Sequence, residues 1–227
     1  MRTRHWIQIG TAAASFAAAE AALAAISLTL SGPITGNTVG PQSISNPCII
    51  AGTTCQQPAS MGYNNFDATG NVSSYNMYST TPTATLADGV QGTPYTVGQL
   101  VGAVGSSAFN VAIDVNTTGA ASETLSLFEV IIDGVVAYSY SGSANIGNVN
   151  NNGNGFADYT LDTVDLSGYQ STSTVLFHAI WSNAVDGAES FFLVGTTPTT
   201  TLPEPGSLAM LGVVLGAIGV TARRKRS

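Results

Sequence analysis

LSLFEVIIDGVVAYSY, which runs from Leu125 to Tyr140, is the stretch that decides the fold class. It holds two runs rich in β-branched and aromatic residues, 125–132 and 135–140, separated by Asp133-Gly134. Such runs favour strands, and an Asp-Gly pair accepts the positive φ angles of a two-residue type I′ turn. The stretch therefore predicts a β-hairpin.

The rest of the middle of the chain carries similar strand signals. From Phe109 to Val115, large apolar residues occupy every second position, which is the period of a strand with one buried face. Further strands are expected at 97–104, 159–164, 175–181 and 190–194. We expect no amphipathic helix between the two ends of the chain. The pattern predicts an all-β fold, an antiparallel β-sandwich of the jelly-roll or immunoglobulin-like type.

The charges of the chain are divided between its ends and its middle. All six Lys and Arg residues lie at the termini, Arg2 and Arg4 at one end and 223–226 at the other. Eleven of the 13 Asp and Glu residues lie in the body of the chain, and the other two, Glu20 and Glu204, lie in the two terminal segments. These carboxylates have no Lys or Arg partner, so they must be solvated, hydrogen-bonded to neutral groups or bound to cations from outside. We expect no nucleic-acid partner, because phosphate binding needs clustered Lys and Arg.

The N-terminal end has the layout of a secretory signal peptide. Arg2 and Arg4 precede an Ala-rich stretch, and Ala22-Leu23-Ala24 supplies the small-x-small pattern that a signal peptidase reads. We therefore expect residues 1–25 to be a signal peptide and the body of the chain to be exported.

The two cysteines, Cys48 and Cys55, lie in this exported body. Disulfides form in oxidising compartments, and the close pair predicts one short disulfide loop. The alternative is a metal or redox pair. It is disfavoured because the spacing is not C-x-x-C and no second Cys/His pair completes a tetrahedral site.

The C-terminal end has three parts in a fixed order. Pro203-Glu204-Pro205 follows a Thr-rich linker at 196–201, an apolar run occupies 206–222, and Arg223-Arg224-Lys225-Arg226 comes directly after it. At about 1.5 Å per residue the apolar run makes a helix of roughly 26 Å, close to the ~30 Å hydrocarbon core of a bilayer. Positive charge is held on the cytoplasmic side, so we expect a transmembrane helix with the body outside.

This tripartite end resembles the PEP-CTERM sorting signal of Gram-negative bacteria, with Pro203-Glu204-Pro205 in the place of the family's motif. The resemblance covers residues 202–227. It implies recognition by an exosortase in the inner membrane, cleavage near the tripeptide, and delivery to the cell surface or the extracellular polysaccharide matrix.

Two other interpretations of the same end are available. The L-P-x-T-G signal of sortase substrates is disfavoured, because Pro205 stands in the place of the Thr whose peptide bond a sortase attacks. A permanent membrane anchor is the other alternative, with Gly212 and Gly216 forming a G-x-x-x-G face for helix pairing.

An Asn- and Gly-rich loop in the body is a candidate metal site. Calcium prefers oxygen ligands on flexible loops, and the candidate ligands are Asn150, Asn152, Asn154 and Asp158. The leading Asp and the closing Glu of an EF-hand are missing. The alternative is a loop in which Asn and Gly serve only to adopt left-handed backbone geometry.

Two further groups of residues are candidate binding sites. Asp186 and Glu189 form a second candidate calcium cluster. Aromatic residues of the expected strands either stack on a carbohydrate or pack in the core. These aromatic residues are Trp181, Tyr138, Tyr140, Tyr159 and Tyr169.

Catalysis has little support in the sequence. His178 is the one histidine left after signal removal, and no G-x-S-x-G nucleophile motif accompanies it. An imidazole packed in a strand is the simpler interpretation. Asp162 and Asp165 would act as glycosidase carboxylates only at a separation that a sequence does not reveal. We therefore expect no enzyme.

These features predict one exported protein in five parts: a signal peptide (1–25), an irregular leading segment (26–90), a β-sandwich (91–195), a linker (196–201) and a sorting signal (202–227). Its expected role is structural or adhesive, at the cell surface or in a biofilm matrix, without a cofactor. The expected partners are an exosortase and the inner membrane during processing, and then exopolysaccharide. The alternative is a carbohydrate-binding or calcium-dependent adhesion module.

Overall fold

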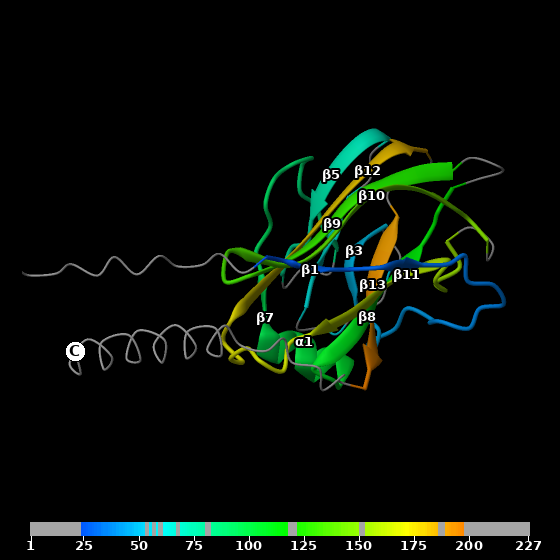
Figure 1. Ribbon diagram of the computed structural model, residues 1–227. Coiled ribbons are helices and arrows are strands. Elements are labelled where there is room, and N and C mark those ends of the chain that lie inside the picture. Colours follow the sequence, from blue (N-terminus) through cyan, green and yellow to red (C-terminus); the bar gives the residue numbers. More distant parts are fainter. Residues whose placement is uncertain are drawn as a thin grey trace, which may run out of the picture.

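The computed structural model describes residues 24–52, 55, 58, 61–66, 69–79, 83–117, 122–149, 153–185 and 189–197 (Figure 1). Within these residues the strands form two sheets, and one short helix accompanies them. For the residues that the structure describes, the prediction of an all-β fold is confirmed.

The predicted hairpin lies at the centre of the first sheet. Its strands, β9 (Ser122–Ile132) and β10 (Val135–Gly147), pair antiparallel. Asp133 and Gly134 between them have φ angles of 49° and 81°, as a type I′ turn requires. The other strands of this sheet are β1 (Ile26–Ser27), β5 (Gly70–Tyr75), β7 (Tyr95–Thr96) and β12 (Thr174–Ala184). The strand order is β1-β10-β9-β12-β5, with β7 also paired to β12.

The second sheet is built around three of the predicted strands. These are β8 (Ala108–Asp114), β11 (Tyr159–Asp165) and β13 (Ser190–Thr196), with β8 between the other two. The remaining strands are β2 (Leu30–Ser31), β3 (Cys48–Ala51), β4 (Tyr63–Asn65) and β6 (Thr83–Ala84). The strand order is β2-β11-β8-β13-β3-β4-β6.

Neither sheet is wholly antiparallel. The parallel pairs are β1 with β10, β3 with β4, and β4 with β6. All three involve short strands from the leading segment. A two-residue hairpin turn can join only antiparallel strands, whereas the chain between the paired strands here is long enough to allow parallel pairing. The prediction of purely antiparallel pairing is therefore wrong at the sheet edges. The jelly-roll or immunoglobulin-like sandwich topology stays a prediction.

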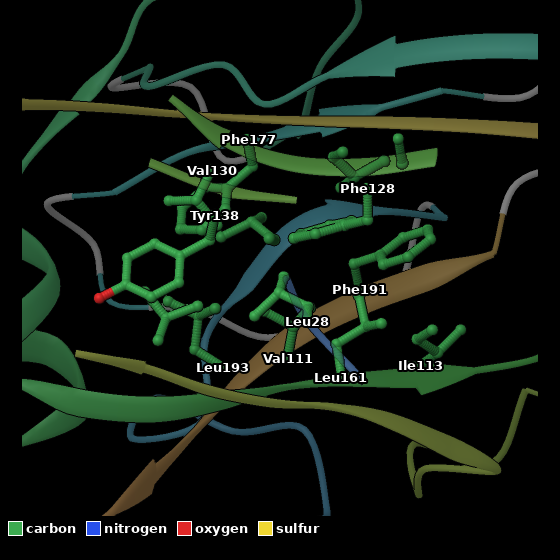
Figure 2. Close-up of a cluster of buried hydrophobic side chains, with 14 of the residues drawn as sticks. Leu28, Val111, Ile113, Phe128, Val130, Tyr138, Leu161, Phe177, Phe191 and Leu193 are labelled. Atoms are coloured by element: carbon green, nitrogen blue, oxygen red, sulfur yellow. The ribbon is translucent and has the colours of Figure 1, made fainter. Parts of the chain in front are cut away.

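Side chains from both sheets share one apolar core, and Figure 2 shows them between strands of the two sheets. Phe128 on β9 stacks on Phe191 of β13 with ring centroids 5.5 Å apart, and Trp181 on β12 lies 5.8 Å from the same Phe191 ring. All three side chains are fully buried. Burial of each such side chain contributes about 1.5–3 kcal/mol. The aromatic contacts therefore bind the two sheets to each other.

The expected strand at 97–104 is wrong, because these residues form a helix, α1 (Val97–Val104). Thr96 caps its N-terminus: Thr96 Oγ1 accepts from the Gln99 N–H at 3.2 Å, and Gln99 Oε1 accepts from the Thr96 N–H at 2.8 Å. Gly105 ends the helix with a left-handed φ of 74°. This capping box and the closing glycine outweigh the strand preference of the valines between them. The expectation that the body contains no helix is corrected with it.

Candidate functional site

The linker to the predicted sorting signal begins on the last strand of the second sheet. β13 lies between β8 and β3, and its residues Phe191, Phe192 and Leu193 are fully buried. Ser106 Oγ donates a hydrogen bond of 2.7 Å to the carbonyl of Thr196, the last residue of the strand. The tail is therefore attached to a firmly held part of the body.

The predicted terminal signals themselves lie outside the described residues. This applies to Pro203-Glu204-Pro205, to Arg223-Arg224-Lys225-Arg226, to the expected transmembrane helix at 206–222 and to residues 1–23 of the signal peptide. Across the part of the chain that is described, no helix has the length and apolar character needed to cross a bilayer.

The predicted cysteine pair is joined in the structure as a disulfide, with Cα atoms 6.1 Å apart. Cys48 begins β3, lies opposite Phe192 of β13, and is fully buried. Cys55 and Tyr63 belong to the same small apolar cluster. The disulfide thus fastens the segment after β3 to the middle of the second sheet.

Asp158, one of the four candidate calcium ligands, has main-chain partners on two segments. Its Oδ2 atom accepts from the Val115 N–H at 2.8 Å, and its Oδ1 atom accepts from the Val149 N–H at 2.9 Å. The side chain is 1% exposed. In this structure Asp158 therefore holds the end of β10 next to the end of β8.

Asn154 is the second described member of that candidate set. Its Oδ1 atom accepts from the Phe156 N–H at 2.9 Å, and its Nδ2 atom donates to Asn37 Oδ1 at 3.2 Å. Asn150 and Asn152 lie outside the described residues. Where the structure is described, no three His, Cys, Asp or Glu side chains are grouped in a way that could hold a metal. A calcium site on these four residues stays a prediction.

Asp114 lies close to this loop, although no motif in the sequence marks it as a candidate site residue. Its Oδ2 atom accepts from the Gly155 N–H at 2.8 Å and from Gln42 Nε2 at 3.2 Å. Burial raises the pKa of Asp114 from 3.8 to about 7, the Gly155 N–H opposes this rise, and the charge of Asp158 adds to it. Asp114 therefore titrates near neutral pH and not in the usual acidic range.

Glu189 was predicted to form a calcium cluster with Asp186. In the structure the carboxyl group of Glu189 lies against that of Glu123, a residue far from it in the sequence. Asp186 lies outside the described residues. Both glutamates are fully buried. Burial and the contact with Glu123 raise the pKa of Glu189 well above its usual value. Two carboxyl groups thus lie against each other out of water.

His178 forms a network on the face of the first sheet that points away from the core. Its Nδ1 atom lies 3.0 Å from Glu129 Oε2, its Nε2 atom lies 2.9 Å from Ser73 Oγ, and its ring stacks on Tyr75 with centroids 4.0 Å apart. This is the bonding order of a Ser-His-acid triad. However, the Ser73 N–H donates to Asp88 Oδ1 at 2.5 Å, so it is not free to stabilise an oxyanion.

The aromatic residues considered for sugar stacking have different surroundings. Trp181 is fully buried and Tyr138 is 5% exposed, so both belong to the core. Tyr140 and Tyr159 are half-buried and pack against that core. Tyr169 is 38% exposed and is the one of these five that presents a large apolar surface to solvent.

The body is therefore a β fold with a disulfide and without Lys or Arg, as expected of an exported protein. Comparison with family models identifies its C-terminal end: residues 201–226 match the PEP-CTERM protein-sorting motif. The match includes Pro203-Glu204-Pro205, the apolar run and the basic residues as far as Arg226. The chain thus carries a signal for export, transient membrane anchoring and processing by an exosortase. No curated protein and no solved structure matches the chain.

Proposed function

We propose that the chain is a non-enzymatic structural or adhesive protein that is released by an exosortase to the cell surface or into the exopolysaccharide matrix. The observation that carries the proposal is the PEP-CTERM match at residues 201–226. The order of tripeptide, apolar run and basic end is what a membrane-embedded processing enzyme needs to hold its substrate with the cleavage site near the outer surface.

Charge distribution supports the direction of export. Between His5 and Ala222 there is no Lys or Arg, so every permanently cationic side chain lies beside one of the two apolar terminal stretches. Positive residues beside an apolar segment stay in the cytoplasm, which leaves the acidic body outside. The disulfide of Cys48 and Cys55 suits the oxidising compartment that the body then occupies.

The surroundings of His178 support a non-enzymatic role. Both ring nitrogens contact side chains of the same sheet, and the side chain is nearly buried. An imidazole placed in this way links strands β5, β12 and β9. A sandwich topology of the jelly-roll or immunoglobulin-like type, common among exported binding and structural domains, is part of the proposal.

Replacement of Pro203-Glu204-Pro205 by three alanines tests the sorting role. Expressed in a host that has an exosortase, the variant should stay in the inner-membrane fraction at full mass, whereas the parent chain should be released with a shortened C-terminus. The matched control replaces Pro198-Thr199-Thr200 by alanines, which alters three residues just outside the matched motif. Equal release of the parent and the Pro203-Glu204-Pro205 variant, with equal intact masses, would refute exosortase processing.

A carbohydrate-binding module is the second candidate function, and one observation favours it. An apolar cavity of about 360 Å³ is lined by Tyr169, Ile26 and Val135, with Asp133 as its carboxylate. An exposed aromatic ring beside a polar group suits the apolar face and the hydroxyls of a sugar. Retention on a glycan array that Tyr169→Ala abolishes would support this function, and absence of retention would leave the structural role.

A further inference from the structure

Glu123 and Glu189 lie where strands of both sheets begin and end. Glu123 is the second residue of β9, and Glu189 directly precedes β13. The segments just after β8 and β12 reach the same place, because Asn116 and Val185 donate hydrogen bonds to the two carboxyl groups. A ligand held by these glutamates would therefore contact elements of both sheets.

Each carboxyl group accepts a hydrogen bond from a main-chain N–H. The Val185 N–H donates to Glu123 Oε1 at 3.0 Å, and the Asn116 N–H donates to Glu189 Oε2 at 2.5 Å. Glu189 is fully buried, and no N–H or O–H group of the described residues donates to its Oε1 atom, while the Glu123 carboxyl group lies against the Glu189 carboxyl group. A buried polar atom without a hydrogen-bond donor lowers the free energy of unfolding by about 1–3 kcal/mol, and by more when the atom is charged. This oxygen requires a proton or a cation.

Among the residues that the structure describes, no Lys or Arg is available for this position. No Lys or Arg occurs between His5 and Ala222, and His178 is engaged with Glu129. The charge of Asp114 also acts on Glu189, and that of Asp158 acts on Asp114. One proton would neutralise one acid of this group, whereas a divalent cation would neutralise the glutamate pair.

The side chain of Asn148 places a neutral oxygen beside the same segment. Asn148 Nδ2 donates to the carbonyl of Thr117 at 3.3 Å, and Thr117 follows the residue that donates to Glu189. In the described structure the Asn148 Oδ1 atom is buried and has no hydrogen-bond partner. Carboxylate, amide and main-chain oxygens completed by water are the ligands of calcium, while zinc favours nitrogen and sulfur.

We propose that Glu123 and Glu189 bind one calcium ion in the exported protein, with Asn148 as a neutral ligand. The site differs from the Asn-rich loop, whose Asn154 and Asp158 have other partners, and it does not depend on exosortase processing. This site has two acidic ligands and one neutral amide ligand, so it needs no group of three acidic side chains. The ion ties the start of β9 to the start of β13 and so stabilises the end of the core.

Calcium titration of the full chain in detergent, after treatment with EDTA, tests the proposal. Calorimetry should give one calcium ion per chain, and calcium should raise the melting temperature. Glu189→Gln and Glu123→Gln should each weaken calcium binding at least tenfold, and Asn148→Ala should weaken it less. Glu129→Gln, the same chemical change on the outward face of the first sheet, should leave calcium affinity unchanged.

Two results would overturn the proposal. If the parent chain gives neither binding heat nor a shift in melting temperature with calcium, the glutamates share a proton instead. If Glu123→Gln and Glu189→Gln together leave calcium affinity as it is in the parent chain, the ion binds elsewhere. Circular dichroism establishes that each variant is folded, and if the glutamate variants do not fold, calcium affinity unchanged by Asn148→Ala rejects the site.

Discussion

His178 on β12 and Glu129 on β9 face each other across neighbouring strands, with Nδ1 and Oε2 3.0 Å apart. On its other side the imidazole reaches Ser73 on β5. A single side chain therefore joins three strands of the first sheet. Because β5 otherwise forms one edge of the main strand path, this link should help to hold it in register.

Replacing His178 by Ala should lower the free energy of unfolding by about 1–3 kcal/mol, because Glu129 and Ser73 lose their shared partner. Urea denaturation of His178→Ala, Glu129→Gln and the double variant gives a double-mutant cycle. The coupling energy should be at least about 0.5 kcal/mol, as for residues in direct contact. Additive effects of the two changes would show that the pair contributes nothing in solution.

The contact between Phe128 and Phe191 leads to a second prediction. Phe128→Ala removes a ring that packs between the sheets and leaves a cavity, so it should lower the free energy of unfolding by about 3–5 kcal/mol. Val135→Ala, at a site that is 60% exposed on the neighbouring strand, should change it by less than about 0.5 kcal/mol. Similar effects from both changes would contradict the assignment of this core.

The strands of the body were predictable because their signals are local. Asp133-Gly134 defines a turn by its own φ angles. The alternation from Phe109 to Val115 marks the face that joins the main core, but the structure also buries Ala112 and Asp114 on the other face, so the expectation of a single buried face is corrected. The parallel pairing of β3 with β4 has no such local signal, because it depends on how the chain between these two strands returns to the same edge of the sheet. The helix at 97–104 did have a local signal, Thr96 with Gln99 and then Gly105, but valine-rich composition suggested a strand.

Thr96→Ala tests the weight of that local signal. Loss of the capping side chain should lower the free energy of unfolding by about 1 kcal/mol, because it leaves the Gln99 N–H without its partner. Thr172→Ala, which makes the same chemical change at an exposed turn position, serves as the control. Guanidinium denaturation measures both variants, and equal stabilities would mean that the cap contributes nothing to the fold.

The candidate site was less predictable than the fold. The sequence pointed to consecutive residues, Asn150 to Asp158, because a loop motif is visible in one stretch. Glu123 and Glu189 come together only after β9 and β13 have folded into different sheets. What the sequence does indicate is that the body between His5 and Ala222 has no Lys or Arg, so a buried acid there needs a proton, a neutral donor or an external cation.

Asp114 gives a prediction for the pH dependence of stability. Its pKa is about 7 in the folded chain, against 3.8 for an ordinary Asp, so between these values the folded state holds a proton that the unfolded chain has lost. The free energy of unfolding should therefore fall as pH rises from about 4 to about 7, and this contribution should be level above that range.

Asp114→Asn should remove that contribution while it keeps an acceptor for the Gly155 N–H. Between pH 4 and pH 7 the stability of the variant relative to the parent should rise by more than about 1.4 kcal/mol, the equivalent of one pKa unit. Urea denaturation in EDTA at several pH values measures this difference without interference from calcium. A constant difference across the range would mean that Asp114 titrates normally.

The disulfide leads to the last prediction, which concerns both stability and compartment. Linking Cys48 to Cys55 closes a short loop, and the loss of chain entropy in the unfolded state corresponds to about 2–3 kcal/mol. Cys48→Ser with Cys55→Ser should lower the free energy of unfolding by about that amount. Mass spectrometry of the exported protein after alkylation should show no labelled thiol until a reductant is added. Labelling of both cysteines without reductant would show that the pair is not joined in the exported chain.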